Sequence, residues 1–124
     1  MVIFSRACAL GLLVAVSLPA STAAHGILLD SIPRAGETTP VPMLRLDLRF
    51  NARIELGLSK LRITGPSGED VPFADGGPKT GGPGQLWATL PPLAPGIYMV
   101  HWQIFTGDGH LSHGRFSFQV GEPK

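Results

Sequence analysis

Proline and glycine interrupt this chain so often that they limit it to short elements. Of its 12 prolines and 16 glycines, 11 and 15 respectively fall after residue 24. Both residues disfavour helix interiors, proline by about 3 kcal/mol relative to alanine. No segment of residues 25–124 sustains the 3.6-residue period of an amphipathic helix. We therefore expect short strands joined by turns.

Apolar and polar residues alternate in several segments, which is typical of strands with one buried face. The alternating segments are Leu44–Phe50, Lys60–Thr64, Leu86–Leu90, Tyr98–Phe105 and Arg115–Val120. Val71 and Phe73 suggest a short edge strand, and the Gly- and Pro-rich residues 74–84 suggest a loop. About seven short strands at regular spacing predict an all-β fold, a single β-sandwich of immunoglobulin-like type.

The N-terminal residues 1–24 have the three parts of a secretory signal peptide. Arg6 supplies the basic start, residues 7–18 are apolar, and small residues follow. The apolar run is shorter than the roughly 20 residues that span a bilayer. Small side chains allow cleavage before His25, or one residue earlier, before Ala24. The alternative is a buried or membrane-anchoring N-terminal helix.

Cleavage would leave one domain, residues 25–124, which we expect to be exported and monomeric. Removing Arg6 from the 10 basic residues leaves nine, against nine acidic residues, so the formal charge is near zero. This balance gives no basic face for nucleic acid or anionic lipid, and nothing in this domain resembles a membrane span. The single cysteine, Cys8, would be lost, which excludes a disulfide and a thiolate metal site.

Asp108, Gly109 and His110 directly follow a predicted strand. By spacing alone, this is an ordinary Asp-Gly turn that happens to carry a histidine. The same turn can also aim a carboxylate and an imidazole at a common point, because Gly109 gives the backbone freedom.

His25 makes a metal site a stronger interpretation. If cleavage exposes it, His25 offers its α-amine and imidazole Nδ1 to one metal ion, and His110 adds a third nitrogen. Asp108 can supply an oxygen or hold a water or an imidazole in place. A planar, nitrogen-rich donor set without sulfur favours one copper(II) ion, whereas zinc prefers a tetrahedral set.

The other two histidines have weaker cases. His101 alternates with core residues, so we expect it on the solvent side of its strand. His113 is either an additional ligand or a residue at the start of the last strand. We find no nucleophile context and no carboxylate pair suited to acid–base chemistry, so no catalytic residue and no enzyme activity are predicted.

A pattern spread over the whole predicted domain resembles the CopC family of periplasmic copper-resistance proteins. It comprises His25-Gly26, Ser31, Pro33, Gly36, Leu90-Pro91-Pro92-Leu93, Pro95-Gly96, Tyr98, Val100, Trp102, Thr106, Asp108-Gly109-His110, Gly114, Phe116, Phe118 and Val120. The resemblance implies a seven-stranded Greek-key sandwich or barrel that stores or carries copper in the periplasm. It also implies one copper(II) ion held in a histidine brace by His25, Asp108 and His110, and a CopD-like inner-membrane partner.

The chain departs from the family at two places. Longer members carry a methionine-rich loop for copper(I), but residues 74–84 contain no methionine, and His113 stands where the family usually has other residues. Two other functions stay open. Polysaccharide monooxygenases also use a histidine brace, although this domain is small and lacks an evident flat aromatic face. A plain immunoglobulin-like interaction domain would instead hold His25 far from the Asp-Gly-His turn.

Overall fold

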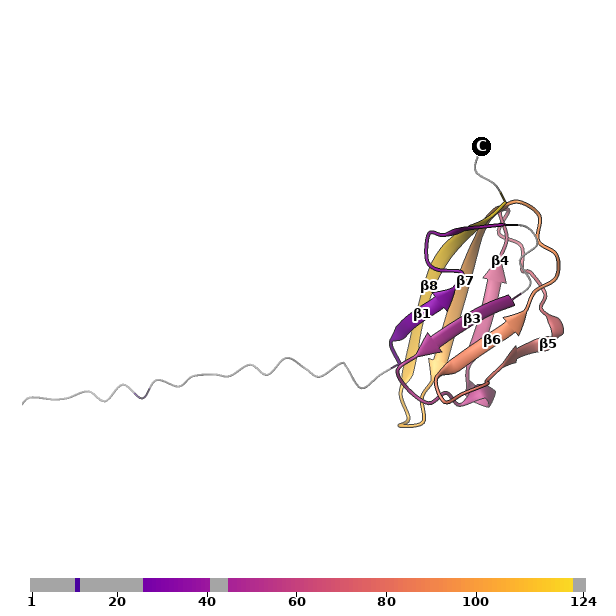
Figure 1. Ribbon diagram of the computed structural model, residues 1–124. Coiled ribbons are helices and arrows are strands. Elements are labelled where there is room, and N and C mark those ends of the chain that lie inside the picture. The colour runs from indigo at the N-terminus through magenta and orange to yellow at the C-terminus, as the bar shows by residue number, and fades with distance from the viewer. Residues whose placement is uncertain (1–10, 12–25, 41–44, 122–124) are drawn as a thin grey trace, which may run out of the picture.

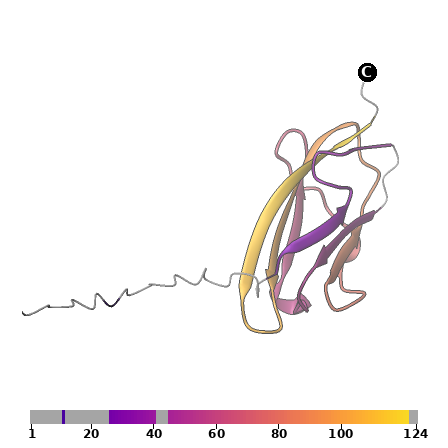
Figure 2. The ribbon, with the colours of Figure 1, turned by 60° about the vertical axis from the view of Figure 1, so that its left-hand side comes forward.

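The computed structural model describes Gly11, residues 26–40 and residues 45–121, which form two β-sheets packed face to face (Figures 1 and 2). One sheet has the order β1 (Leu28–Ile32), β3 (Arg45–Phe50), β6 (Gln85–Thr89) and β5 (Ala74–Lys79). The other has the order β2 (Thr38–Thr39), β8 (Leu111–Val120), β7 (Gly96–Phe105) and β4 (Lys60–Thr64). Both sheets have open edges, so the predicted all-β sandwich is confirmed and its closed-barrel variant is not adopted.

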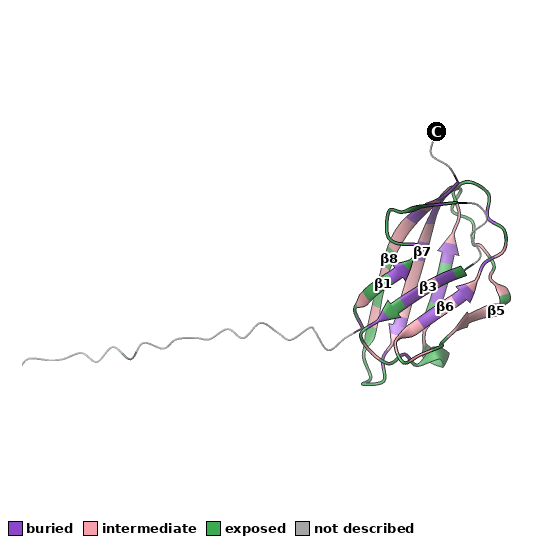
Figure 3. Cartoon of the chain, in the orientation of Figure 1, coloured by how far each residue is buried: buried purple, intermediate pink, exposed green. Residues whose placement is uncertain are grey.

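The core lies between the sheets, and strand alternation builds it. Leu46 and Leu48 of β3 are fully buried, as are Val100 and Ile104 of β7 on the facing sheet. Figure 3 shows buried positions interleaved with exposed ones along the strands. The remaining buried apolar residues are Phe50, Ile54, Leu61, Ile63, Leu86, Ala88, Leu90, Leu93, Tyr98, Phe118 and Val120. Period-two burial identifies the same inward faces that the sequence predicts.

Trp102 completes the core next to the β7–β8 turn. Its ring meets Phe50 edge-on, with centroids 4.9 Å apart and planes at 67°. Gly114 lies opposite it on β8, where an added Cβ would come within 2.5 Å of the indole. A side chain at position 114 would therefore displace the ring.

Residues 74–84, expected to be a loop, are partly strand. β5 pairs antiparallel with β6 at both of its ends, with an irregular register between Ala74 and Lys79. Asp75, Gly76 and Gly77 have positive φ angles of 58°, 80° and 105°. Such a left-handed bulge removes the alternation that marks a strand, which is why the sequence did not reveal it.

The edge strand predicted around Val71 and Phe73 is wrong. An isolated bridge joins Thr64 to Asp70 there, and the ladder does not continue. Pro72 lacks the amide hydrogen that a ladder needs. Conversely, β1 forms at residues whose sequence shows no alternation, because Leu28 and Ser31 pair with β3.

The β7–β8 hairpin is the longest ladder of the sandwich. It holds ten residue pairs, from Gly96 opposite Val120 to Phe105 opposite Leu111. The 3-10 helix η1 (Leu56–Leu58) lies against β7, and the hairpin turn projects at the same end (Figure 1). In the described ranges no helix is both long and apolar enough to cross a membrane.

Leu48→Ala tests the assignment of the core. Leu48 is fully buried, so the change should lower the free energy of unfolding by about 2–5 kcal/mol. Leu29→Ala is the control on the neighbouring strand. Leu29 is 65% exposed, so its loss should cost less than about 0.5 kcal/mol. Urea unfolding followed by circular dichroism measures both, and equal losses would contradict the assignment.

Candidate metal centre

Buried Thr106 organises the turn between β7 and β8. Its amide donates to the carbonyl of His110 at 2.8 Å, and the amide of Gly109 donates back to Thr106 at 2.9 Å. Gly109 has a φ of 89°, in the left-handed region that favours glycine. Thr106 also forms an isolated antiparallel β-bridge with Ile54, in the segment between β3 and η1. These bonds close a tight turn and project Asp108 and His110 from it.

The Thr106 hydroxyl positions the Asp108 carboxylate. It donates a hydrogen bond to Asp108 Oδ1 and accepts one from the amide of His110 at 3.3 Å. The Thr106 hydrogen bond holds the pKa of Asp108 below its usual range. Partial desolvation opposes this lowering, and the hydrogen bond and charge of His110 add to it. Asp108 is therefore an anion at neutral pH, as a metal-binding carboxylate must be.

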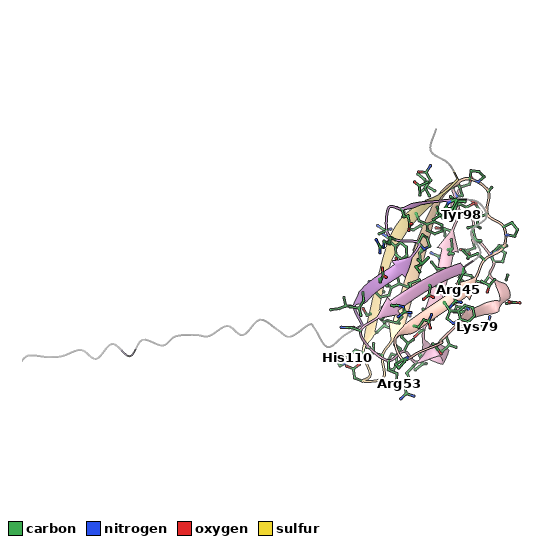
Figure 4. All side chains as sticks on the ribbon, in the orientation of Figure 1. Arg45, Arg53, Lys79, Tyr98 and His110 are labelled. Carbon is green, nitrogen blue, oxygen red and sulfur yellow. The ribbon has the colours of Figure 1, made fainter. Side chains whose placement is uncertain are left out.

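Asp108 and His110 face each other. Asp108 Oδ2 lies 3.2 Å from His110 Nδ1, and the two side chains are 46% and 51% exposed. A carboxylate beside one ring nitrogen fixes the orientation and tautomer of the imidazole. The pair thus offers an oxygen and an oriented nitrogen at the surface, and Figure 4 places His110 at one end of the sandwich.

The chain enters β1 directly beside this turn. The Ser112 hydroxyl donates to the carbonyl of Gly26 at 2.8 Å. Gly26 packs so tightly that an added Cβ would lie 2.2 Å from Ile104 Cδ1 and 3.2 Å from Thr106 Cγ2. Gly26 therefore contacts the same threonine that positions Asp108.

A second contact fixes the path of the following residue. The amide of Ile27 donates to Asn51 Oδ1 at 2.8 Å, and the Asn51 amide donates to the carbonyl of Ile27 at 3.1 Å. The start of the described chain is thus held from two sides, by β8 through Ser112 and by the bend after β3 through Asn51.

The predicted ligand His25 lies outside the described residues, as does the predicted boundary between residues 24 and 25. Within the parts of the chain that are described, no group of three or more His, Cys, Asp or Glu side chains could hold a metal ion. A metal ion bound by Asp108 and His110 would therefore need further ligands from outside the described side chains.

His113 lies on the other side of β8 from the metal centre. Ser112 points toward Gly26, and side chains alternate along a strand, so His113 points the opposite way. It sits opposite Gln103 in the ladder and lines a groove with His101. Of the two interpretations of His113, the structure supports the strand position.

His101 occupies the outer face of β7, as predicted, but it is half-buried. Its Nε2 lies 3.1 Å from Thr64 Oγ1. Burial is the main cause that lowers the pKa of His101. The positive charges of Arg62 and Arg115 lower it further, and Asp70 opposes them. At neutral pH this imidazole is uncharged.

Sequence reasoning did not assign roles to Thr106, Ser112 and Asn51. Thr106 could have been found as a turn residue, because Ser and Thr hydroxyls bond to nearby backbone in turns, as Thr106 does with the amide of His110. Ser112 and Asn51 act through contacts with Gly26 and Ile27, which are 86 and 24 residues away along the chain. No local pattern carries that information.

Comparison with known proteins establishes the family. A model of the CopC domain matches residues 28–121, most of the chain. The chain belongs to the CopC family. Protein YobA of Escherichia coli strain K12 is 30% identical over 113 residues, which cover 90% of this chain and 91% of that protein. Copper resistance protein C of Xanthomonas campestris pv. juglandis is 30% identical over 115 residues, covering 87% and 90%.

Solved CopC structures share the sandwich. The crystal structure of CopC from Methylosinus trichosporium OB3b matches with a TM-score of 0.73 and 28% identity, covering 81% of this chain and 97% of that one. PcoC, a methionine-rich copper resistance protein from Escherichia coli, matches with a TM-score of 0.67 and 24% identity, covering 77% and 98%. The likeness to PcoC is one of fold.

His101 provides a test of the electrostatics on the outer face of β7. Its imidazole should titrate below 6.5 in the folded protein and near 6.5 in urea. The folded state then binds fewer protons, so this group's stabilising contribution is present above about pH 6.5 and is lost as the pH falls below it. Proton NMR measures the titration, and His101→Gln assigns the signal. Arg62→Gln should raise the midpoint, and an unchanged midpoint would contradict the charge effect.

Proposed function

We propose that this CopC protein binds one copper(II) ion in the periplasm, for copper storage, trafficking or resistance, without catalytic turnover. The ligands are the α-amine and imidazole of His25, together with Asp108 and His110. The observation that supports this best is the packing of Gly26 against Thr106 and Ser112, beside the Asp108–His110 pair. His25 precedes Gly26, and consecutive Cα atoms are about 3.8 Å apart.

The donor chemistry fits copper(II) as the cargo. Asp108 Oδ2 and His110 Nδ1 lie 3.2 Å apart, so a metal ion that takes the place of the proton between them can bind both groups. Together with the two nitrogens of His25, this ring nitrogen gives a three-nitrogen set to which the ionised Asp108 adds an oxygen. Copper(II) heads the affinity order of divalent first-row ions for such nitrogen and oxygen ligands.

Export supplies the free amine that this set needs. Residues 1–24 have the parts of a signal peptide, and cleavage before His25 would expose the amine. The name of the Xanthomonas relative, copper resistance protein C, supports a copper-related role. By family resemblance, the partner is a CopD-like inner-membrane protein.

Two features favour binding over oxidative catalysis. An ionised carboxylate at the metal occupies a position that oxygen would otherwise need. The surface beside the turn carries Leu111 and Ile27 as exposed apolar side chains rather than a flat aromatic platform. An interaction domain without metal is disfavoured, because it predicts that residue 25 lies far from the Asp-Gly-His turn, whereas Gly26 packs against Thr106 of that turn.

Copper titration tests the ligand set. Protein beginning at His25 should saturate at one equivalent of copper(II). Retaining Ala24 displaces the amine and should weaken binding by about 100-fold or more, since outer-shell changes alone typically cost about 10–100-fold. Asp108→Asn and His110→Gln should weaken binding similarly. His113→Gln is the matched control and should bind as the unmodified protein does. Equal affinity with and without Ala24 would overturn the site.

Gly26→Ala tests the path of the N-terminal segment. The added methyl would lie 2.2 Å from Ile104 Cδ1, so residues 25–26 must shift away from the turn. Copper affinity should fall at least about tenfold, as for misplaced outer-shell groups. Adding Ile104→Val removes the closest contact and should restore part of the loss. Gly57→Ala, at a position with open space around it, is the control. Unchanged copper affinity in Gly26→Ala would contradict the role of Gly26.

A further inference from the structure

The outer face of β4, β7 and β8 carries a groove that the metal centre does not use. Its volume is about 390 Å³. The strand registers place six of its side chains in two rows across the three strands. One row is Lys60, Gln103 and His113, and the other is Arg62, His101 and Arg115.

These rows concentrate positive charge on a chain whose overall formal charge is only +1. Neighbouring strands are about 4.8 Å apart, so Arg62 and Arg115 flank His101 on both sides. The positive charge acts on that imidazole, because both arginines lower the pKa of His101. Arg62 also forms a salt bridge with Asp70 at 3.6 Å, and both side chains are more than half exposed.

On the opposite sheet, two cations have partners. There Arg45 lies 4.0 Å from the centroid of the Trp87 ring and 3.2 Å from the Asp47 carboxylate, and Lys79 lies 5.2 Å from the same ring. In the groove, by contrast, neither row contains an acidic side chain. Arg62 and Arg115 lie on either side of His101, so an anionic ligand between them would interact favourably with both.

Two histidines in one groove could instead suggest a second metal site. Three permanent cations within the same two rows oppose a metal ion, and no third metal-ligating side chain joins His101 and His113 among the described residues. The charge therefore favours an anion over a cation.

The spacing of the rows matches an extended acidic peptide. The rows are two residues apart along each strand, a separation of about 6.6 Å. Alternate side chains of an extended peptide have the same separation and lie on the same face. Carboxylates at every second position would therefore meet Arg62 or Arg115 in one row and Lys60 in the other.

The groove also leads toward the metal centre. Gln103 and His113 form the row nearer the hairpin turn, and one further pair on this face, Phe105 with Leu111, separates them from it. Leu111 is 57% exposed and adjoins His110. A polypeptide in the groove would thus lie within about 10 Å of the turn.

We propose that this groove docks an extended acidic segment of the protein with which this chain exchanges its metal. The link to metal exchange rests on the proposed copper function, whereas the docking itself rests on the two rows alone.

Fluorescence anisotropy with a labelled peptide of alternating glutamate and serine tests the docking, without copper and at low ionic strength. Arg62→Gln with Arg115→Gln should weaken binding roughly tenfold, the size expected for losing two exposed ion pairs. The control double variant, Arg34→Gln with Arg49→Gln, removes the same charge elsewhere and should bind as the parent does. Circular dichroism checks the fold of both variants.

Absence of peptide binding, or equal losses in the two double variants, would overturn the proposal. A second outcome would also overturn it: the parent protein sediments with phosphatidylglycerol vesicles, the Arg62/Arg115 variant does not, and peptide binding is the same in both. That result would assign the groove to a membrane surface. Copper titration of the groove variant should match the parent protein. A failure of peptide docking is thereby distinguished from a failure of the metal site.

Discussion

The long antiparallel pairing of β7 with β8 is the constraint on which the rest of this structure depends. Its inward side chains, among them Val100, Ile104 and Phe118, supply about a third of the buried apolar residues of the core. Its outward side chains form most of the cationic groove. Its turn carries Asp108 and His110, and Ser112 at its end holds Gly26. One ladder therefore fixes the core, the turn and the groove relative to one another.

Because these features share one ladder, disturbing one affects the others in a predictable way. Gly114 and Trp102 are an example. The indole of Trp102 packs toward the core on one side of the sheet, and both residues also line the groove on the other side. A larger residue at position 114 would displace the ring and deform the groove floor together.

Much of the fold could be predicted from the sequence, because alternation reports burial directly. β3, β4, β6 and β7 coincide closely with the predicted segments. β5 was not predicted, because Asp75, Gly76 and Gly77 form a left-handed bulge in place of an alternating run. β1 was not predicted either, because its burial comes from pairing with β3 rather than from its own pattern.

The turn that carries Asp108 and His110 could be predicted, since Gly109 marks it. The side of β8 that His113 occupies could not, because it depends on the contact between Ser112 and Gly26. The identity of His25 as a ligand stays a prediction.

The close packing of Gly26 has a consequence for where in the cell the protein can bind copper. Ile104 and Thr106 pack closely against this glycine and fix its position. The number of residues that precede Gly26 therefore decides whether a free amine lies beside the turn. On the proposed processing, the precursor has an amide where the exported form has an amine, and it cannot complete the ligand set. Copies waiting for export would then leave the cytoplasmic copper supply untouched, and the peptidase that trims the leader would also act as the step that activates the protein.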